Sequence, residues 1–342
     1  MLILDIEENL QFANDFKDDY SSLIKDEKEN ILTNLKEYIF DIKKNFLLKS
    51  KKTDNETFKR QKKNLMMHIE NELAYGLENK IKFIFKTYFS DNKIDEIIII
   101  EPKNQKKFIE KFSNEYLIKH DNNTKFIIDS LLKILFIEKG YETIKSSDKK
   151  KFYNNHKIKT CIYCNRNYIF NLDSNGHVKG HIDHFYPKDL YPYFSMSYYN
   201  LIPCCSTCNY IKGTFDTFNA NSISPYLRNN DKLFETDPIS NFEYKFKPFN
   251  EELLKKLKIK DIYNEGHTDI VNDLYIKFFH QNTQKYFNGL KRAHKELTLN
   301  QEDFYRFITN SLKKEKDFHK RSFSKMTYDI IHEEFESLYK KL

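Results

Sequence analysis

Apolar side chains recur every three or four residues through much of the first 140 positions, which is the spacing of one face of an α-helix. The clearest series are Ile31, Leu35, Ile39, Ile42 and Phe46, and then Leu65, Ile69, Leu73, Leu77, Ile81, Ile84 and Tyr88. Two more helices are predicted around Phe108–Tyr116 and Ile127–Leu135. The run Ile97–Ile100 fits either a short strand or a buried helical turn, and its periodicity does not decide between them.

The pattern changes after residue 145. Residues 145–159 are polar and basic, and we interpret them as a linker, either a solvated loop or a nucleic-acid contact. Tyr168–Asn171 and His177–Phe185 have the character of strands. The turn-forming residues Asp173–Gly176 lie between them and predict a hairpin.

Beyond Tyr226 the sequence predicts strands at Phe242–Phe246 and Leu257–Ile262. Helical spacing then returns in Ile270, Leu274 and Phe278; in Phe304, Ile308 and Leu312; and in Ile330, Ile331, Phe335 and Leu338. We therefore expect an α+β protein that is mainly helical. The expected domains are a helical N-terminal region at 1–150, a core at 151–230 and a mainly helical C-terminal region at 231–342.

Composition limits the function classes. The 342 residues are 39% hydrophobic and 31% charged, and the net charge of +7 permits a phosphate-bearing partner without requiring one. The first residues turn acidic at once and lack the basic start of a secretion signal. No apolar run approaches membrane-spanning length. We expect a cytoplasmic protein without membrane contact, in which thiols stay reduced.

The five cysteines all lie between residues 161 and 208. Cys161-x-x-Cys164 and Cys205-x-x-Cys208 have the spacing of two zinc knuckles, and four thiolates would complete the shell of a structural Zn²⁺. Cys204 competes with Cys205 for this role, but the two-residue gap to Cys208 favours Cys205. The alternative is that these cysteines are merely buried.

Polar residues between and beside the knuckles suggest a second chemistry. Asp183 and His184 are adjacent on a predicted strand, and Asn209 follows Cys208 directly. If Cys205 opens a helix, Asn209 lies one turn along it. Aspartate and asparagine supply the oxygen ligands that Mg²⁺ prefers, and a histidine can take a proton from water near neutral pH.

Asp-His-x-x-Pro, then Asn-Leu, then Cys-x-x-Cys-Asn resembles the zinc-knuckle form of the HNH, or ββα-metal, endonuclease motif. The resemblance implies that His184 is the general base and that Asp183 and Asn209 bind a catalytic Mg²⁺ or Mn²⁺. It implies that Asn200 fixes the loop between strand and helix. The matching stretch is about residues 158–228, which predicts a small ββα-metal core held by a four-cysteine zinc site.

The wider wording of the motif is similar to HNH proteins that accompany ATPases in bacterial anti-phage systems, such as Septu and its retron-linked relatives. The residues that carry this likeness are Thr160-Cys161-Ile162-Tyr163-Cys164-Asn165-Arg166 and His184-Phe185-Tyr186-Pro187-Lys188. The resemblance implies an antiviral effector that works with an ATPase partner.

Several other side chains have two interpretations. Arg166, Lys188 and Lys212 could bind phosphates, or they could be ordinary surface charges. His181 shares a strand face with Asp183 and could support a metal, contact nucleic acid or only fill polar space. The aromatic residues from Phe185 to Tyr199 fit packing better than a base-stacking platform.

The expected function is a metal-dependent endonuclease that hydrolyses phosphodiester bonds of nucleic acid, with DNA favoured over RNA. The alternatives are a non-catalytic, zinc-stabilised module that binds nucleic acid, and a module that docks an ATPase.

Overall fold

The computed structural model describes residues 2–50, 67, 76–117, 121–169, 180–229, 231–240, 243–247, 249, 251–280 and 282–340. Internal contacts divide the chain into two compact units. The first, here called the helical unit, comprises Glu8–Lys145 and Tyr186–Leu201. The second, the cysteine unit, comprises Met1–Glu7, Ser146–Phe185 and Ile202–Leu342.

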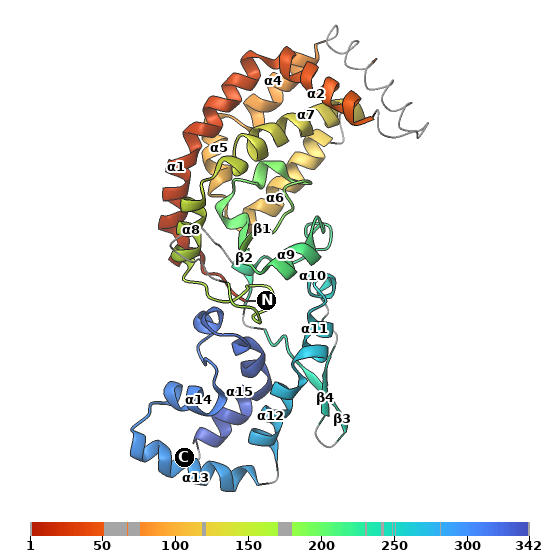
Figure 1. Cartoon of the computed structure of the whole chain (residues 1–342). Helices are drawn as coiled ribbons and strands as arrows, with labels where there is room; N and C mark the ends of the chain where they lie inside the picture. The colour runs from red at the N-terminus through yellow and green to blue at the C-terminus, as the bar shows by residue number, and fades with distance from the viewer. Residues whose placement is uncertain are drawn as a thin grey trace. The chain divides into compact units, whose positions relative to one another are not determined.

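The helical unit consists of helices packed around an apolar core (Figure 1). Its α-helices are α1 (Ile6–Thr33), α2 (Leu35–Ser50), α4 (Leu77–Tyr88), α5 (Asp91–Ile98), α6 (Pro102–Phe112) and α7 (Asn122–Lys133). Single π-helical turns, η1 (Ser113–Leu117) and η2 (Ile134–Glu138), extend α6 and α7. The helices predicted from the apolar spacing of residues 77–135 are therefore confirmed.

Two details of this unit refine the sequence interpretation. The apolar series that starts at Ile31 crosses from α1 into α2, and Ile31, Leu35, Ile39 and Ile42 are all buried. The ambiguous run Ile97–Ile100 begins in the last turn of α5, so the helical alternative is correct. Leu65, Ile69 and Leu73 lie outside the described residues.

The segment Tyr186–Leu201 connects two strands of the cysteine unit but belongs to the core of the helical unit. The Ser195 hydroxyl donates to the Phe136 carbonyl at 2.6 Å, and the Ser197 hydroxyl donates to the Ile97 carbonyl at 2.5 Å. Tyr193 packs edge-on against Phe112. The aromatic residues of this segment are buried, which confirms the prediction that they pack rather than form a platform.

The cysteine unit contains two small sheets and the remaining helices (Figure 1). Strands β1 (His181–His184) and β2 (Leu201–Cys204) form one sheet, and β3 (Thr236–Ser240) pairs antiparallel with β4 (Glu243–Phe246) in the other. The helices are α8 (Ser146–His156), α9 (Ser206–Lys212), α10 (Glu252–Lys256), α11 (Ile259–Gly266), α12 (Thr268–Phe279), α13 (Thr283–Leu297), α14 (Gln301–Thr309) and α15 (Ser324–Lys340).

Two predicted elements are wrong. Residues 146–156 form helix α8 rather than a linker, because Phe152, Tyr153 and His156 give one buried helical face within a basic sequence. The predicted strand at 257–262 falls largely in α11. Leu257 and Ile259 imitate strand alternation, but the next buried side chain is Tyr263, four residues after Ile259, as a helix requires.

The predicted strand pairing is settled only in part. The strand ending at Phe185 exists as β1, and the predicted strand at 242–246 exists as β4. The turn Asp173–Gly176 and His177 lie outside the described residues. Among the described residues β1 pairs with β2, while Tyr168 forms an isolated bridge with Thr160.

Asn165, which follows the first cysteine pair, joins this part of the cysteine unit to the C-terminal helices. Its side-chain NH₂ donates to the carbonyls of Phe318 and Arg321 at 3.0 and 3.1 Å. Its side-chain oxygen accepts from the Lys325 N–H at 3.0 Å. The Asn165 backbone adopts the left-handed conformation, with φ of 49°. The side chain of this loop residue thus accepts a hydrogen bond from a backbone N–H in the first turn of α15.

The fold prediction is confirmed: the protein is mainly helical and has a small two-stranded sheet near a buried four-cysteine cluster. The division at residues 150 and 230 stays a prediction. Within the described ranges, no helix combines the length and apolar character needed to cross a bilayer.

Candidate metal centre and neighbouring polar cluster

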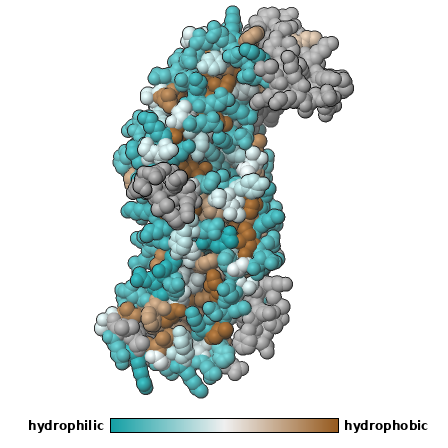
Figure 2. Space-filling model, viewed as in Figure 1, coloured by the Kyte–Doolittle hydropathy of each residue, from teal (hydrophilic) through white to brown (hydrophobic). Residues whose placement is uncertain are grey.

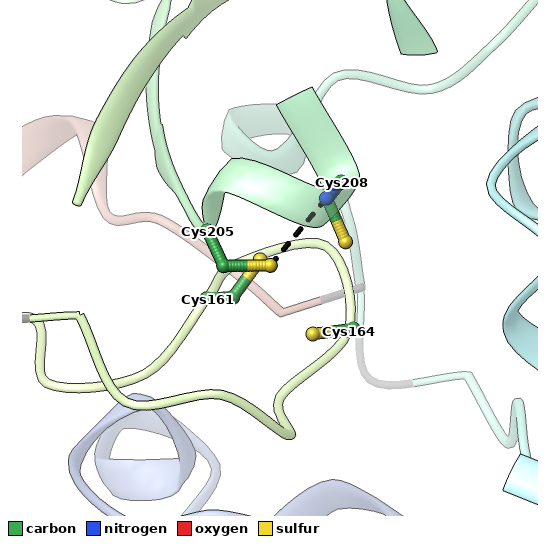
Figure 3. Close-up of side chains that lie close together, drawn as sticks. All are labelled: Cys161, Cys164, Cys205 and Cys208. Atoms are coloured by element: carbon green, nitrogen blue, oxygen red, sulfur yellow. Dashed lines mark hydrogen bonds between the residues drawn. The ribbon is translucent and has the colours of Figure 1, made fainter. Parts of the chain in front are cut away.

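Cys161, Cys164, Cys205 and Cys208 converge in the cysteine unit. Figure 3 shows two side chains that come from the loop at 161–164 and two that come from the first turn of α9, with the sulfurs turned toward one another. All four residues are buried, and their sulfurs lie within 4.8 Å of one another. This is the set that the spacing predicts.

The donor set fits zinc. Zinc–sulfur bonds of about 2.3 Å in a tetrahedron place the sulfurs about 3.8 Å apart, so the observed cluster needs little contraction. Burial raises the pKa of Cys161 well above its usual value, and contacts with the other thiols add to this effect. Four thiolates in an apolar interior need a compensating cation. The cluster is consistent with structural zinc, with no open position for a substrate.

Cys204 lies outside this cluster. It is the last residue of β2 and is fully buried. Burial, and then the charge of Asp183, raise the pKa of its thiol well above the usual value. Cys204 therefore behaves as a small apolar side chain.

The cysteine cluster includes the start of α9, and α9 packs against β1. Cys205 is the N-cap of α9, and its sulfur accepts a hydrogen bond from the Cys208 N–H at 3.5 Å. Cys205 thus opens the helix, and Asn209 lies one turn along it. The Asn209 side-chain nitrogen is 3.5 Å from Nδ1 of His181, at the exposed first residue of β1.

Asp183 is buried and its carboxylate is held from two directions. The Tyr163 hydroxyl, from the loop between Cys161 and Cys164, donates to Oδ2 at 2.5 Å. Nζ of Lys212, on α9, is 3.2 Å from Oδ1 and 3.0 Å from Oδ2. Burial raises the pKa of Asp183, and Lys212 and then Tyr163 oppose that rise. Burial, and then the charge of Asp183, raise the pKa of Tyr163, so its hydroxyl stays protonated as a donor.

Lys212 also ties α9 to the main chain of β1. Its ammonium donates to the His184 carbonyl at 2.7 Å, and its side chain has no exposed surface. His184 itself is 6% exposed. The Lys212 ammonium faces Asp183 and the main chain of β1. The phosphate contact predicted for Lys212 stays a prediction.

Asn200 fixes a loop of the helical unit. Its side-chain oxygen accepts from the Tyr186 N–H at 2.8 Å. Its NH₂ group donates to the carbonyls of Tyr186 and Phe194 at 3.1 and 3.0 Å. These three bonds tie Asn200, near the end of the Tyr186–Leu201 segment, to Tyr186 at its start and to Phe194. A catalytic contribution of Asn200 stays a prediction.

The other predicted phosphate ligands have their own surroundings. Arg166 is half-buried, and its carbonyl accepts from the Ser322 hydroxyl at 2.6 Å. Lys188 belongs to the helical unit, where it lies 3.3 Å from Glu142 and over the ring of Tyr141. Nucleic-acid binding by either residue stays a prediction.

Sequence reasoning missed the contacts of Tyr163 and Asn165. Both stand in or beside the first cysteine pair, where they read as ordinary knuckle residues. The sequence signal was their place beside metal ligands, where side chains that orient neighbouring groups are often found. The sequence did not show which residues Tyr163 and Asn165 contact, because these partners lie far away in the chain.

Comparison with curated proteins gives one partial likeness. Over 77 residues the chain is 35% identical to the Septu protein PtuB of Bacillus thuringiensis. This alignment covers 22% of the chain and 28% of the PtuB sequence, so the chain spans less than a third of the relative that it matches. No family model matches the chain. No solved structure matches it either.

Proposed function

We propose that this protein is a metal-dependent endonuclease that hydrolyses phosphodiester bonds of nucleic acid. The observation that carries the proposal is the His-Asp-His strand β1 lying against α9, with His181 beside Asn209 and both elements anchored next to the four cysteines. Sequence likeness to the HNH motif assigns chemical roles to these same residues. The zinc site then serves as the scaffold.

In this mechanism His184 would accept the proton of the attacking water, and Asp183 and Asn209 would hold the catalytic ion. The fit of Asp183 is adequate, because a carboxylate offers about four lone-pair positions and Tyr163 and Lys212 occupy three of them. A bound divalent ion would polarise the phosphate and stabilise the leaving oxygen. Within the described residues no second group of three His, Cys, Asp or Glu side chains converges, so water and phosphate oxygens would complete the shell.

The biological setting proposed is antiviral defence. The partial likeness to the Septu protein PtuB supports this setting. We propose DNA rather than RNA as the substrate, on the resemblance of the motif alone. The proposed products carry a 5′-phosphate and a 3′-hydroxyl.

A second candidate is a non-catalytic module in which the zinc core only scaffolds. The burial of Asp183 and His184, each 6% exposed, favours it. The two candidates differ in one measurement. The purified chain, incubated with supercoiled plasmid and Mg²⁺, nicks or linearises the DNA only in the first case. Absence of cleavage with DNA and with RNA, in Mg²⁺ and in Mn²⁺, would favour the second.

Replacing Tyr163 with Phe should weaken the catalytic ion site without disturbing zinc. The substitution removes only the hydroxyl that orients Asp183, and loss of such an orienting partner typically costs about 10- to 100-fold in metal affinity or activity. The measurement is the Mg²⁺ concentration that gives half-maximal cleavage.

Tyr263→Phe is the matched control for this variant. Tyr263 is also fully buried, and its hydroxyl donates to the Cys164 carbonyl at 2.6 Å rather than to Asp183. Its Mg²⁺ dependence should equal that of the wild type. Equal shifts in both variants would show a general weakening of the knuckle and contradict the positioning role of Tyr163.

We further propose that helices outside the core bind an ATPase partner, through residues 1–150 or 235–342. Most of the surface in Figure 2 is hydrophilic, with separate apolar patches. Exposed rings occur in both regions, for example Phe83 at 67% and Phe307 at 57% exposure. Such side chains are available for a protein contact.

Co-expression with an ATPase encoded beside this protein should yield a complex on size-exclusion chromatography. Phe83→Ser and Phe307→Ser should differ in their effect, and the variant that lowers recovery of the complex identifies the region. A chain that elutes alone, and whose cleavage is unchanged by the ATPase and ATP, would refute the partnership.

A further inference from the structure

Tyr210 stands out among the aromatic residues of the protein. It is 87% exposed, which makes it the most exposed large apolar side chain among the described residues. Most other tyrosines near the motif are buried, including Tyr163, Tyr186 and Tyr226. At this exposure the ring buries little surface in the packing of α9.

The neighbours of Tyr210 along its helix do not cover it. Ser206 and Thr207, four and three residues earlier, are small, polar and exposed, and Gly213 three residues later has no side chain. The buried face of α9 is formed instead by Cys208 and Lys212. The ring therefore projects from the helix without an apolar neighbour at these three positions.

Tyr210 is the chain neighbour of one candidate catalytic residue. Tyr210 directly follows Asn209, whose amide lies 3.5 Å from exposed His181. An exposed ring whose helix neighbours Ser206 and Thr207 are small and polar differs from a protein-binding patch, in which apolar side chains gather at the centre. It suits a ligand that offers one flat face together with polar and anionic groups, as a nucleotide does.

We propose that Tyr210 stacks on an unpaired nucleobase beside the bond that is cut. This inference rests on the proposed function and narrows its substrate class. A base inside a duplex offers no free face, so the preferred substrate contains unpaired nucleotides: a single strand, a gap or a frayed end. In this arrangement Tyr210 would contact the base, and Asn209, the preceding residue of α9, would bind the catalytic ion.

The test is equilibrium binding to fluorescent oligonucleotides, with Ca²⁺ in place of Mg²⁺ to prevent cleavage. Tyr210→Ala should weaken binding of a single strand by roughly 5- to 100-fold, the range for loss of one stacked base. Tyr210→Phe should bind as the wild type does, because it keeps the ring. Phe40→Ala, which removes an exposed ring from α2, should have no effect. Affinity for a blunt duplex should change less than affinity for the single strand.

A 2-aminopurine base placed along the oligonucleotide supplies a direct readout of stacking. Its fluorescence should be quenched by the wild type and Tyr210→Phe but not by Tyr210→Ala. Unchanged single-strand affinity in Tyr210→Ala would overturn the inference. So would an equal loss in Tyr210→Phe, which would indicate a hydrogen bond from the hydroxyl.

The outcome is separable from that of the proposed function. A wild-type chain that cleaves DNA while Tyr210→Ala binds and cuts normally overturns only the stacking role. A wild-type chain that neither binds nor cleaves any nucleic acid overturns the endonuclease proposal itself, and the stacking inference with it.

Discussion

His184→Ala is expected to lower metal-dependent cleavage by about a hundred- to ten-thousand-fold, the usual cost of losing a general base. The reason is that water is a poor nucleophile until its proton is taken, and this variant leaves no imidazole at that position. The measurement is the single-turnover cleavage rate of plasmid DNA, with zinc content and thermal unfolding recorded in parallel.

The structure indicates that this variant should keep the local fold. Lys212 bonds the His184 carbonyl rather than its ring, so that link between α9 and β1 survives the substitution. His181→Ala is the informative companion, because His181 is the exposed first residue of β1 and lies beside Asn209. Wild-type cutting by His184→Ala, together with loss of cutting in His181→Ala, would move the base to His181.

Cys161→Ser and Cys208→Ser are each expected to abolish zinc binding and unfold the cysteine unit. Structural zinc in small sites contributes about 10–16 kcal/mol, which is comparable with the whole stability of a typical domain. Elemental analysis and thermal unfolding measure the two effects. Cys204→Ser is the matched control and should retain the metal, because Cys204 lies outside the cluster.

The damage should extend beyond the knuckle. The Tyr263 hydroxyl is bonded to the Cys164 carbonyl, and the Asn165 side chain is bonded to Phe318, Arg321 and Lys325. Hydrogen exchange in residues 318–330 should therefore rise when zinc is removed. A folded, soluble wild-type preparation without zinc would refute the structural role of the metal, and loss of zinc in Cys204→Ser would refute this choice of ligands.

The sequence alone predicted much of the fold, for a physical reason. Helical periodicity reports which residues share a face, and this local property identified the helices of residues 77–135 as well as α12, α14 and α15. It failed where local signals conflicted. The basic composition of residues 146–156 hid α8, and the alternation at Leu257 and Ile259 imitated a strand.

The sequence likewise predicted one part of the candidate site, the cysteine cluster, better than the other part, the catalytic residues. Two Cys-x-x-Cys pairs fix their ligands locally, because each turn presents two sulfurs to one ion whatever surrounds it. The cysteine cluster was therefore predictable. A helix start at Cys205 was only a condition in the sequence argument, and the structure supplies it. Catalysis by Asp183, His184 and Asn209 is still a proposal that rests on motif resemblance and awaits the cleavage experiments.

Only the tertiary structure decided how the polar residues are used. Asp183 is held by Tyr163 from one knuckle and by Lys212 from α9, and these partners lie 20 and 29 residues away in the chain. Likewise, Tyr186–Leu201 belongs to the helical unit, although the segments before and after it in the chain belong to the cysteine unit. Burial and hydrogen bonding between distant segments depend on how the elements pack. The sequence therefore does not show that, within one short helix, Lys212 is buried and Tyr210 is exposed.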